Sequence, residues 1–301
     1  MKCDKCGGKA VYFRRYSGQY LCSAHFEEYF EEKVRKTLLK EKMLRRSEDI
    51  GIAFSGGKDS VVTLFVLNKL AEKLDLKLSC ISIDEGIKGY RDKSLEIANS
   101  ICSRFGVQLH IASFKEHFGY SLDEMVASNR ACTYCGVLRR RLLNEKAREL
   151  DVDKLATGHN LDDEVQAIMM NYLRGDVERL ARLGTPARGN GFIARIKPLS
   201  KMPEKEVALY AILKDLGPSF DECPYSASFR TGVRDFVNKL EKENPGIKFS
   251  ILKGYEKITP YLENYERAEL KRCMSCGEPS SQEICNACKL LDEVRSLRQD
   301  S

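Results

Sequence analysis

The chain has 301 residues, 43% of them hydrophobic and 31% charged, a composition that provides a buried core and argues against a membrane protein. At roughly 150 residues per domain, this length allows one large domain with attached modules, or two domains. Lys and Arg number 50 against 44 Asp and Glu, and the net charge of +6 permits a nucleic-acid partner without requiring one.

Cysteine usage indicates metal binding in a reducing compartment. Eight of the twelve cysteines fall in four C-x-x-C pairs, a spacing typical of metal ligands. Disulfide scaffolds are usually short secreted chains, whereas this chain is long. Its first residues also lack the apolar segment of a signal peptide. We therefore expect a reduced, cytoplasmic, metal-binding protein.

The first predicted element is a zinc module near the N-terminus. Its ligands form two short pairs separated by 15 residues: Cys3, Cys6, Cys22 and His25. Three thiolates and one imidazole suit a tetrahedral structural zinc, and Gly7-Gly8 permits a tight turn. The alternative for His25 is an ordinary histidine at a helix start. A linker helix over residues 27–46 should follow, because acidic residues begin this stretch and basic residues end it.

The middle zone, residues 49–265, alternates short apolar runs with amphipathic stretches. The expected strands are residues 49–54, 78–84, 107–112 and 154–157, and the expected helices are residues 59–74, 92–105, 136–150 and 162–174. This alternation predicts an α/β fold with a parallel sheet covered on both faces. Ligands of such sheets lie beyond the carboxyl ends of the strands. Cys80 and Cys102 fall within these apolar patterns, so we expect them in the core.

The loop after the first strand has the composition of a phosphate site. It reads Ser55-Gly56-Gly57-Lys58-Asp59-Ser60 and opens a helix. Glycines let the backbone approach an anion closely, and unpaired N–H groups at a helix start point at it. The order differs from the Walker A motif, because two glycines directly precede Lys58 and Asp59 follows it. The alternative is an ordinary tight turn with Asp59 near a helix cap.

Three further cysteines lie inside the middle zone. Cys132 and Cys135 begin a basic helix that continues through Arg139–Arg141, and Cys223 lies far downstream. A helix start favours thiolate, so we expect lowered thiol pKa values there. Three interpretations stay open: a redox or persulfide site, an iron–sulfur cluster held by all three thiols, and plain buried cysteines. Three thiolates are one short of the usual four ligands, which would leave one iron open to sulfide.

The C-terminal zone repeats the pattern of the N-terminal zone. Its ligands form two C-x-x-C pairs eight residues apart: Cys273, Cys276, Cys285 and Cys288. This is the signature of a tetrahedral zinc site made of four cysteines, with Gly277 in the turn. A filled structural site has no open position, so both end metals should stabilise the fold rather than catalyse. The expected units are residues 1–48, 49–265 and 266–301.

Several motifs of the middle zone resemble the PP-loop ATP-pyrophosphatase superfamily. The resemblance covers Ser55–Ser60, Asp84-Glu85-Gly86 after the second strand, and residues 158–163 after the fourth. It implies a parallel-sheet nucleotide-binding domain that cleaves ATP between the α and β phosphates. The substrate of such an enzyme is adenylated.

The resemblance also assigns roles to individual residues. Backbone near Ala53 and Ile83 would hold adenine, and the segment at Gly158 would close around the nucleoside. Asp59 and Asp163 would lie near magnesium or the reacting groups. The alternative for the acidic residues around Asp163 is their general preference for a first helical turn.

With the three internal cysteines and the two metal ends, nearly the whole chain resembles tRNA 2-thiouridine synthetases of the NcsA and TtuA type. The resemblance implies that Cys132, Cys135 and Cys223 ligate a [4Fe-4S] cluster and that Arg139 contacts the nucleotide. The uridine O2 atom would attack the α-phosphate of ATP, and pyrophosphate would leave. Sulfide on the open iron would then attack C2, with AMP leaving. Lys58, the loop amides and Mg²⁺ would stabilise charge on the phosphates.

The same resemblance implies the partners. These are tRNA, a sulfur donor and a second copy of the chain in a homodimer. The donor is either a ubiquitin-like carrier protein with a C-terminal thiocarboxylate or free sulfide. The wobble uridine is favoured over a T-loop uridine as the target. The candidate tRNA surfaces are Arg139–Arg141, residues 174–188, the pair Arg230 and Arg234, and the two zinc modules.

Three other functions share part of this pattern. A lysidine synthetase has a PP-loop and an RNA substrate but no need of the three cysteines. A cytidine 2-thiolase shares the cysteines but generally lacks the metal ends. A non-enzymatic zinc-dependent RNA-binding scaffold would release no pyrophosphate from ATP and tRNA. Anaerobic iron analysis and pyrophosphate release therefore separate these alternatives.

Overall fold

The centre of the protein is a parallel sheet. The computed structural model describes residues 1–125, 130–183, 191–221, 223–225, 229–262 and 271–299. The strands of the sheet are β3 (Asp49–Ala53), β4 (Lys77–Asp84), β5 (Gln108–Ser113), β6 (Lys154–Ala156) and β7 (Ala194–Ile196). They lie in the order β5-β4-β3-β6-β7, and every neighbouring pair is parallel. The order reverses between β3 and β6, so the loops that follow these two strands meet.

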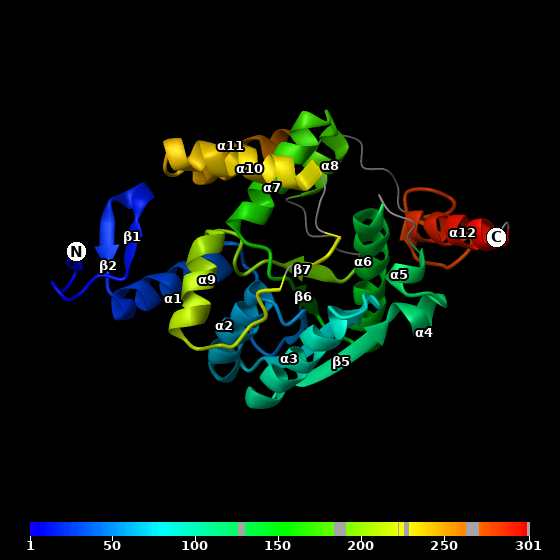
Figure 1. The fold of residues 1–301 in the computed structure, drawn as a ribbon, viewed down its shortest axis with the longest axis horizontal. Helices are drawn as coiled ribbons and strands as arrows, with labels where there is room; N and C mark the ends of the chain where they lie inside the picture. The colour runs from blue at the N-terminus through cyan, green and yellow to red at the C-terminus, as the bar shows by residue number, and fades with distance from the viewer. Residues whose placement is uncertain (126–129, 184–190, 222, 226–228, 263–270, 300–301) are drawn as a thin grey trace.

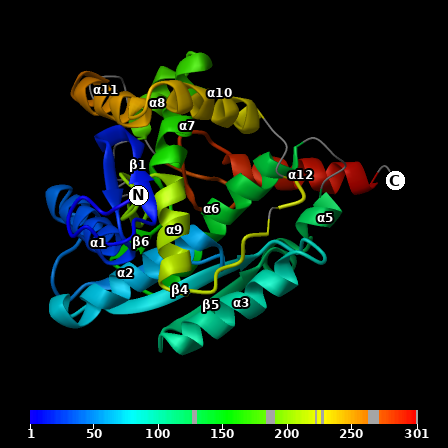
Figure 2. The same ribbon diagram turned by 60° about the vertical axis from the view of Figure 1, so that its left-hand side comes forward.

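Helices cover both faces of the sheet, as the alternation predicted. The first face carries α2 (Lys58–Leu74) and α3 (Arg91–Arg104), with α9 (Glu204–Leu213) between α2 and α1 (Ser23–Lys40) (Figures 1 and 2). The second face carries α4 (Phe114–Phe118), α5 (Leu122–Met125) and α6 (Ala131–Glu149). Along β4, Cys80 belongs to the first core and Ile81 to the second, which is the period of two that a doubly covered strand requires. Cys80 and Cys102 are both buried in the first core, as expected.

A group of helices stands beyond the sheet. It consists of α7 (Leu161–Leu173), α8 (Val177–Arg182), α10 (Phe229–Glu243) and α11 (Ile247–Leu262). These helices share a third apolar core, and Figure 1 shows them grouped above the sheet. Helix α7 begins five residues after the end of β6, so its first turn lies at the carboxyl edge of the sheet. None of the described helices has the length and apolar character that crossing a membrane would need.

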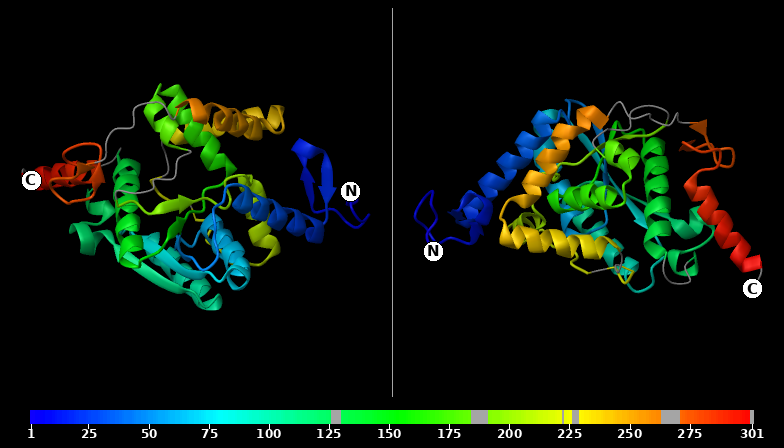
Figure 3. Two further views of the ribbon diagram at one scale, coloured as in Figure 1. Left: turned by 180° about the vertical axis from the view of Figure 1, so that it is seen from behind. Right: turned by 90° about the horizontal axis from the view of Figure 1, so that it is seen from above.

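The two cysteine-rich zones lie at opposite ends of the molecule (Figure 3). The N-terminal zone contains the antiparallel pair β1 (Tyr12–Arg14) and β2 (Gln19–Leu21), joined by a short 3-10 helix, Arg15–Ser17. The C-terminal zone contains the antiparallel pair β8 (Lys271–Arg272) and β9 (Pro279–Ser280), followed by α12 (Asn286–Gln299). The division into units 1–48, 49–265 and 266–301 stays a prediction, and its second boundary lies outside the described residues.

The predicted linker helix over residues 27–46 is wrong at both ends. Helix α1 begins at Ser23 and ends at Lys40. It stops because Lys42 adopts a left-handed conformation (φ 49°), and the N–H of Met43 bonds back to the carbonyl of Leu38 at 2.9 Å. Arg45 and Arg46 therefore lie beyond the helix, so the dipole argument that placed them in its last turn does not apply.

Candidate functional site

The predicted phosphate loop adopts a conformation that requires glycine. Gly56 has φ +80°, and a methyl group there would lie 2.7 Å from the carbonyl oxygen of Ser94. The Ser60 hydroxyl donates to the carbonyl of Gly57 at 2.8 Å and lies 3.3 Å from the amide of Ser55. These bonds hold the loop against the first turn of α2. Helix α2 begins at Lys58, and the loop and the helix N-terminus together form a cradle for an anion.

Lys58 and Asp59 lie at the start of α2 and contact each other. The Lys58 ammonium lies 3.0 Å from Asp59 Oδ2 and 2.8 Å from Glu204 Oε1 on α9. Although burial opposes it, the two carboxylates raise the pKa of Lys58, so the lysine stays charged. Burial raises the pKa of Asp59, against the effect of Lys58. Glu204 was not predicted, because nothing in the sequence pattern joins it to a loop so distant along the chain.

The segment that follows β6 closes against this loop. A methyl group on Gly158 would lie 2.8 Å from the backbone of Asp59 and 2.9 Å from that of Ser60, so only glycine allows this approach. The Asn160 side chain donates to Asp59 Oδ1 at 3.0 Å and accepts from the amide of Asp163 at 3.1 Å. The structure therefore brings the two segments together, as predicted for the carboxyl edge of the sheet.

Asp163 has the helix-start role that the sequence offered as the alternative, and its role near magnesium or the reacting groups stays a prediction. Its carboxylate completes a capping box with the amide of Asn160 and also binds the Arg230 guanidinium. Burial raises the pKa of Asp163, and Arg230 counteracts this shift. The neighbouring Asp162 has a different role, because it is buried in an ion pair with Lys248. Of these two carboxylates, Asp163 is therefore the one available to the site.

The adenine positions of the prediction lie at the ends of two adjacent strands. Ala53 is the last residue of β3, and Ile83 is the penultimate residue of β4. The two strands pair in parallel, and the Phe54 amide continues the ladder with the Ile81 carbonyl at 2.8 Å. Both positions therefore border the phosphate loop, while their contact with adenine stays a prediction.

The three internal cysteines come from two distant segments that meet at the start of α6. Cys132 and Cys135 lie in its first turns, and the Cys132 thiol donates to the carbonyl of Tyr225 at 3.1 Å. Tyr225 lies two residues after Cys223, and Cys135 and Cys223 pack against the same apolar core. The three thiols thus gather at one place. Among the described residues, the only groups whose ligand atoms all lie within 4.8 Å of one another are the two at the chain ends. The three internal thiols are therefore spread more widely than the ligands of either end set.

The predicted lowering of thiol pKa values is wrong for Cys135. Burial raises the pKa of Cys135 to about 11, although Arg139 opposes this shift, and burial also raises the pKa of Cys223. Removal of the thiolates from water outweighs the helix dipole, because these thiols pack against apolar side chains rather than projecting into solvent.

A chain of polar contacts links the cysteines to the phosphate loop. The Arg139 guanidinium donates to Cys135 Sγ at 2.9 Å and pairs with Glu85 Oε1 at 2.7 Å. The other oxygen of Glu85 pairs with Arg91 at 3.1 Å, and Arg91 donates to the carbonyl of Ser55 at 3.3 Å. Glu85 belongs to a predicted motif, whereas Arg91 was missed because it reads as an ordinary first-turn residue of a helix.

The basic candidates for tRNA contact differ in their partners. Arg141 pairs with Glu145 at 2.7 Å, and Arg230 is bound to Asp163 inside the site. Arg234 lies 3.6 Å from the carboxylate of Asp235. Of the candidate stretch 174–188, residues 184–188 lie outside the described part of the chain.

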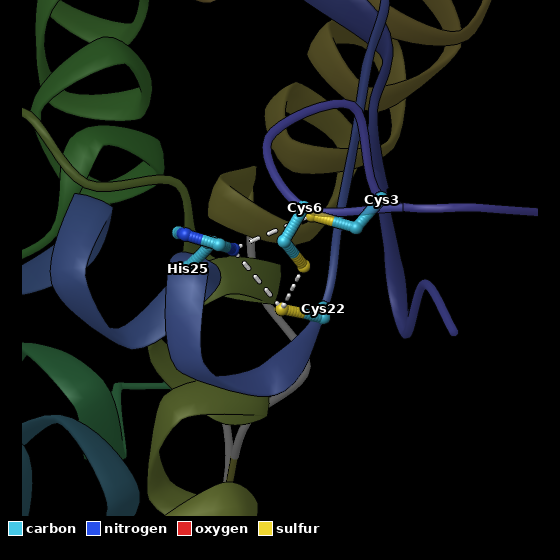
Figure 4. A group of neighbouring side chains, drawn as sticks. All are labelled: Cys3, Cys6, Cys22 and His25. Carbon is cyan, nitrogen blue, oxygen red and sulfur yellow. Dashed lines mark hydrogen bonds between the residues drawn. The ribbon is translucent and has the colours of Figure 1, made fainter. Parts of the chain in front are cut away.

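The N-terminal ligand set is assembled as predicted (Figure 4). His25 Nδ1 lies 3.5 Å from Cys3 Sγ and 3.3 Å from Cys22 Sγ, and Cys6 Sγ lies 3.8 Å from Cys22 Sγ. Gly7 has φ +74°, and its amide closes the turn on the carbonyl of Cys3. Although burial opposes it, backbone N–H groups lower the pKa of the Cys3 thiol to about 6. Four converging soft ligands suit one tetrahedral ion.

The C-terminal ligand set has the same design. The shortest contacts among its thiols are 3.6 Å between Cys276 and Cys285 and 3.9 Å between Cys273 and Cys288. Gly277 has φ +71° and closes the turn on Cys273. Although burial opposes it, backbone N–H groups lower the pKa of Cys273 to about 6. None of the twelve cysteines, all of which are described, forms a disulfide.

Each end zone is attached to a helix that also carries a site residue. The buried carboxylate of Glu206 on α9 accepts hydrogen bonds from the hydroxyls of Tyr12, Tyr16 and Tyr29 at 2.8–3.2 Å. On the other side, Glu293 of α12 accepts from the Tyr134 hydroxyl on α6 at 2.8 Å. The N-terminal zone is therefore attached to α9, which carries Glu204, and the C-terminal zone to α6, which carries Cys132 and Cys135.

Comparisons with known proteins agree with this geometry. Residues 26–241 match the model of the PP-loop domain family, and residues 2–27 match the N-terminal LIM domain of the 2-thiouridine synthetase TtuA. The tRNA 2-thiolation protein NcsA of Haloferax volcanii is 37% identical over 99% of this chain and 100% of its own length. The tRNA-5-methyluridine(54) 2-sulfurtransferase of Pyrococcus horikoshii is 40% identical over 96% and 93%.

One solved structure matches nearly the whole chain. It is the U34-tRNA thiolase NcsA of Methanococcus maripaludis with its [4Fe-4S] cluster. The TM-score is 0.86 at 41% identity, and the match covers 97% of this chain and 96% of the other.

Proposed function

Because this chain belongs to the PP-loop family of tRNA 2-thiolation proteins, we propose that it is an ATP-dependent tRNA uridine 2-sulfurtransferase. The target we propose is the wobble uridine, since the solved thiolase that covers 97% of the chain acts on U34. The observation that carries the proposal is the contact chain from Cys135 through Arg139, Glu85 and Arg91 to Ser55. It joins a thiol site to a nucleotide site.

The phosphate loop supplies the activation step. Its backbone amides and the Lys58 ammonium bind the β and γ phosphates, which leave as pyrophosphate when the uridine O2 attacks the α-phosphate. Lys58 is suited to this task because its raised pKa keeps it charged. In the same proposal, backbone at Ala53 and Ile83 holds adenine. Gly158 lets its segment lie against the loop and enclose the nucleoside.

Asp59 and Asp163 are the proposed carboxylates for Mg²⁺. Both present oxygen atoms, the ligand type that Mg²⁺ prefers, and Asn160 bridges them. In the structure their negative charges are balanced by Lys58 and Arg230. A divalent cation with the nucleotide would take over part of this balance, and Asp163 would orient the ion or accept a proton.

Cys132, Cys135 and Cys223 are the proposed ligands of a [4Fe-4S] cluster. The donor set fits, because three thiols from two segments converge and are spread more widely than the ligands of a single ion. When bound, the cluster would supply the sulfur that replaces the adenylated oxygen. Arg139 orients Cys135 through its hydrogen bond and contacts the nucleotide in this proposal.

The end sets are proposed to hold one structural Zn²⁺ each, because four soft ligands leave no open position. The substrate is tRNA, and the sulfur donor is a carrier protein with a C-terminal thiocarboxylate or free sulfide. We place the protein in the cytoplasm, where its unpaired thiols stay reduced. The proposed assembly is a homodimer.

Anaerobically purified protein tests the function directly. We expect iron and acid-labile sulfide together with two zinc ions per chain, and formation of 2-thiouridine when ATP, sulfide and tRNA are present. Nucleoside mass spectrometry with tRNA fragment mapping identifies the target, and a thiolated T-loop fragment would replace the wobble assignment. Lys58→Ala is the matched control, because it removes the loop cation while the cysteines remain.

The same assay distinguishes the other functions. Lysidine would indicate a lysidine synthetase, and 2-thiocytidine would indicate a cytidine thiolase. A protein that binds tRNA but releases no pyrophosphate would be a scaffold. Each of these outcomes contradicts the proposed function.

A further inference from the structure

Two arginines near the cysteine site, Arg140 and Arg195, differ in their contacts from the arginines beside them. Arg140 on α6 is exposed and Arg195 on β7 is partly exposed. Within the described part of the chain, neither side chain forms an ion pair or a hydrogen bond. By contrast, the neighbouring Arg139 and Arg141 each pair with a glutamate at 2.7 Å.

Hydrogen bonds fix α6 beside the residues that lead into β7. Asn144 donates to the carbonyl of Gly191 at 3.1 Å and accepts from the amide of Ile193 at 2.9 Å. Arg140 lies one helical turn before Asn144 on the same helix face. Arg195 is the middle residue of β7, two residues after Ile193. Because α6 ends shortly before β6 begins, its N-terminal end lies toward the carboxyl edge of the sheet. Going from Asn144 back to Arg140 along α6, and from Ile193 on to Arg195 along β7, therefore leads toward the carboxyl edge of the sheet, where the site lies.

The Arg140 guanidinium folds back toward the cysteine pair. A methyl group on Gly136 would lie 3.4 Å from Arg140 Nη1, and Gly136 directly follows Cys135. A glycine weakens a helix interior relative to alanine, and here it leaves room for the guanidinium. Burial and the charge of Arg140 lower the pKa of Arg195, which agrees with two cations close together. An anion between them would relieve this repulsion.

Building on the proposed function, we propose that Arg140 and Arg195 form a phosphate-binding pair for the tRNA backbone beside the target nucleotide. Guanidinium groups bind phosphate oxygens through paired N–H donors. The target base must leave its stack to reach the site, so the phosphates that flank it enter with it. The ATP phosphates already have the loop amides and Lys58. Arg139, Arg141 and Arg230 already pair with carboxylates, so Arg140 and Arg195 are better placed to bind a tRNA phosphate.

The test compares wild-type protein with Arg140→Gln, Arg195→Gln and the double variant. The control is Arg35→Gln, which changes an exposed arginine on α1 that pairs with Glu32. tRNA affinity is measured over a series of salt concentrations, and ATP affinity is measured without tRNA. We expect the double variant to bind tRNA about tenfold more weakly at low salt. The slope of the logarithm of tRNA affinity against the logarithm of salt concentration (the salt slope) should become shallower by about 0.7–0.9 per lost phosphate contact. ATP affinity should be unchanged.

Two results would overturn the inference. Weakened ATP binding with an unchanged tRNA salt slope would assign the pair to the triphosphate, and no change in either affinity would leave it without a phosphate ligand. Replacement of both residues by lysine should keep the salt slope, and thermal unfolding curves confirm that each variant is folded. These binding measurements do not require a loaded cluster. Failure of the pair is thus distinguishable from failure of thiolation by the wild type.

Discussion

The end cysteine sets and the internal trio use the same residue type in different ways. At each end, two ligand pairs lie close in sequence, a glycine closes the turn, and all four ligand atoms lie within 4.8 Å. The internal trio joins the start of a helix to a segment almost 90 residues downstream, from Cys135 to Cys223. Its thiols are spread more widely, and Cys135 accepts a hydrogen bond from Arg139.

This difference is what the proposed roles require, a structural metal site at each end and a reactive site at the trio. A closed four-ligand set leaves no position for a substrate, whereas a three-thiol set does. The closed sets lie at opposite ends of the molecule, and the zones that carry them contact α9 and α6 (Figure 3). Four predictions test this comparison, beginning with the largest expected effect.

Cys223→Ala should remove the cluster and leave both end metals in place. We expect thiolation to fall by at least about 100-fold, because the variant loses a direct ligand. Iron, acid-labile sulfide and zinc are quantified on the same anaerobic sample. Cys102→Ala, which changes a buried core cysteine, is the matched control and should keep its iron. Normal thiolation by Cys223→Ala would refute the three-ligand model.

Cys276→Ser should have the opposite effect on the metals, losing an end metal and keeping the cluster. It should release one zinc per chain and loosen α12, while iron stays bound. Activity should fall nearer tenfold than 100-fold, because α6 is still packed against the sheet after its contact with Glu293 is lost. Metal analysis and tRNA thiolation are the measurements. Loss of iron in this variant would show that the two kinds of site are not independent.

Glu206→Ala should weaken the attachment of the N-terminal zone. Three tyrosine hydroxyls would lose their buried acceptor, at a cost of about 1–3 kcal/mol in unfolding free energy. Denaturant unfolding measures the change. Glu178→Ala removes an exposed pair with Arg182 and should change stability by less than about 0.5 kcal/mol. Equal effects of the two substitutions would contradict the docking role of Glu206.

The smallest effect concerns acid sensitivity at the centre of the molecule. Burial and the nearby Lys197 lower the pKa of His159 to about 4, whereas the pKa of a histidine in the unfolded chain is about 6.5. Between these values the unfolded chain binds a proton that the folded chain does not, so stability falls as the pH falls through this window.

His159→Gln should therefore flatten the pH dependence of stability between about pH 6.5 and pH 4. The difference should be below about 1 kcal/mol, because much of the His159 surface is exposed, and the solvent there offsets most of the desolvation that lowers its pKa. Thermal unfolding over this range measures it. Identical profiles for variant and wild type would show that His159 does not titrate differently on folding.

Much of this protein was determined by the sequence alone. The end sets were predictable because their ligands are adjacent pairs with local turn geometry, and the structure assembles both. The strands from β3 to β6 and the phosphate loop followed from local patterns of apolar residues and glycines. Only the fold explains why Gly56 and Gly158 must be glycine, because each lies very close to another part of the backbone.

Tertiary structure decided the rest, because those contacts join residues with no regular spacing. Three such contacts depend on the order of strands in the sheet. They are Glu85 between Arg91 and Arg139, Glu204 on Lys58, and the bonds of Asn144 to the residues just before β7. The fold also reversed the expected thiol pKa of Cys135, since burial depends on the whole core and not on the helix start. Local sequence thus specified the closed ligand sets at the two ends, while the tertiary fold brought the open trio of cysteines together.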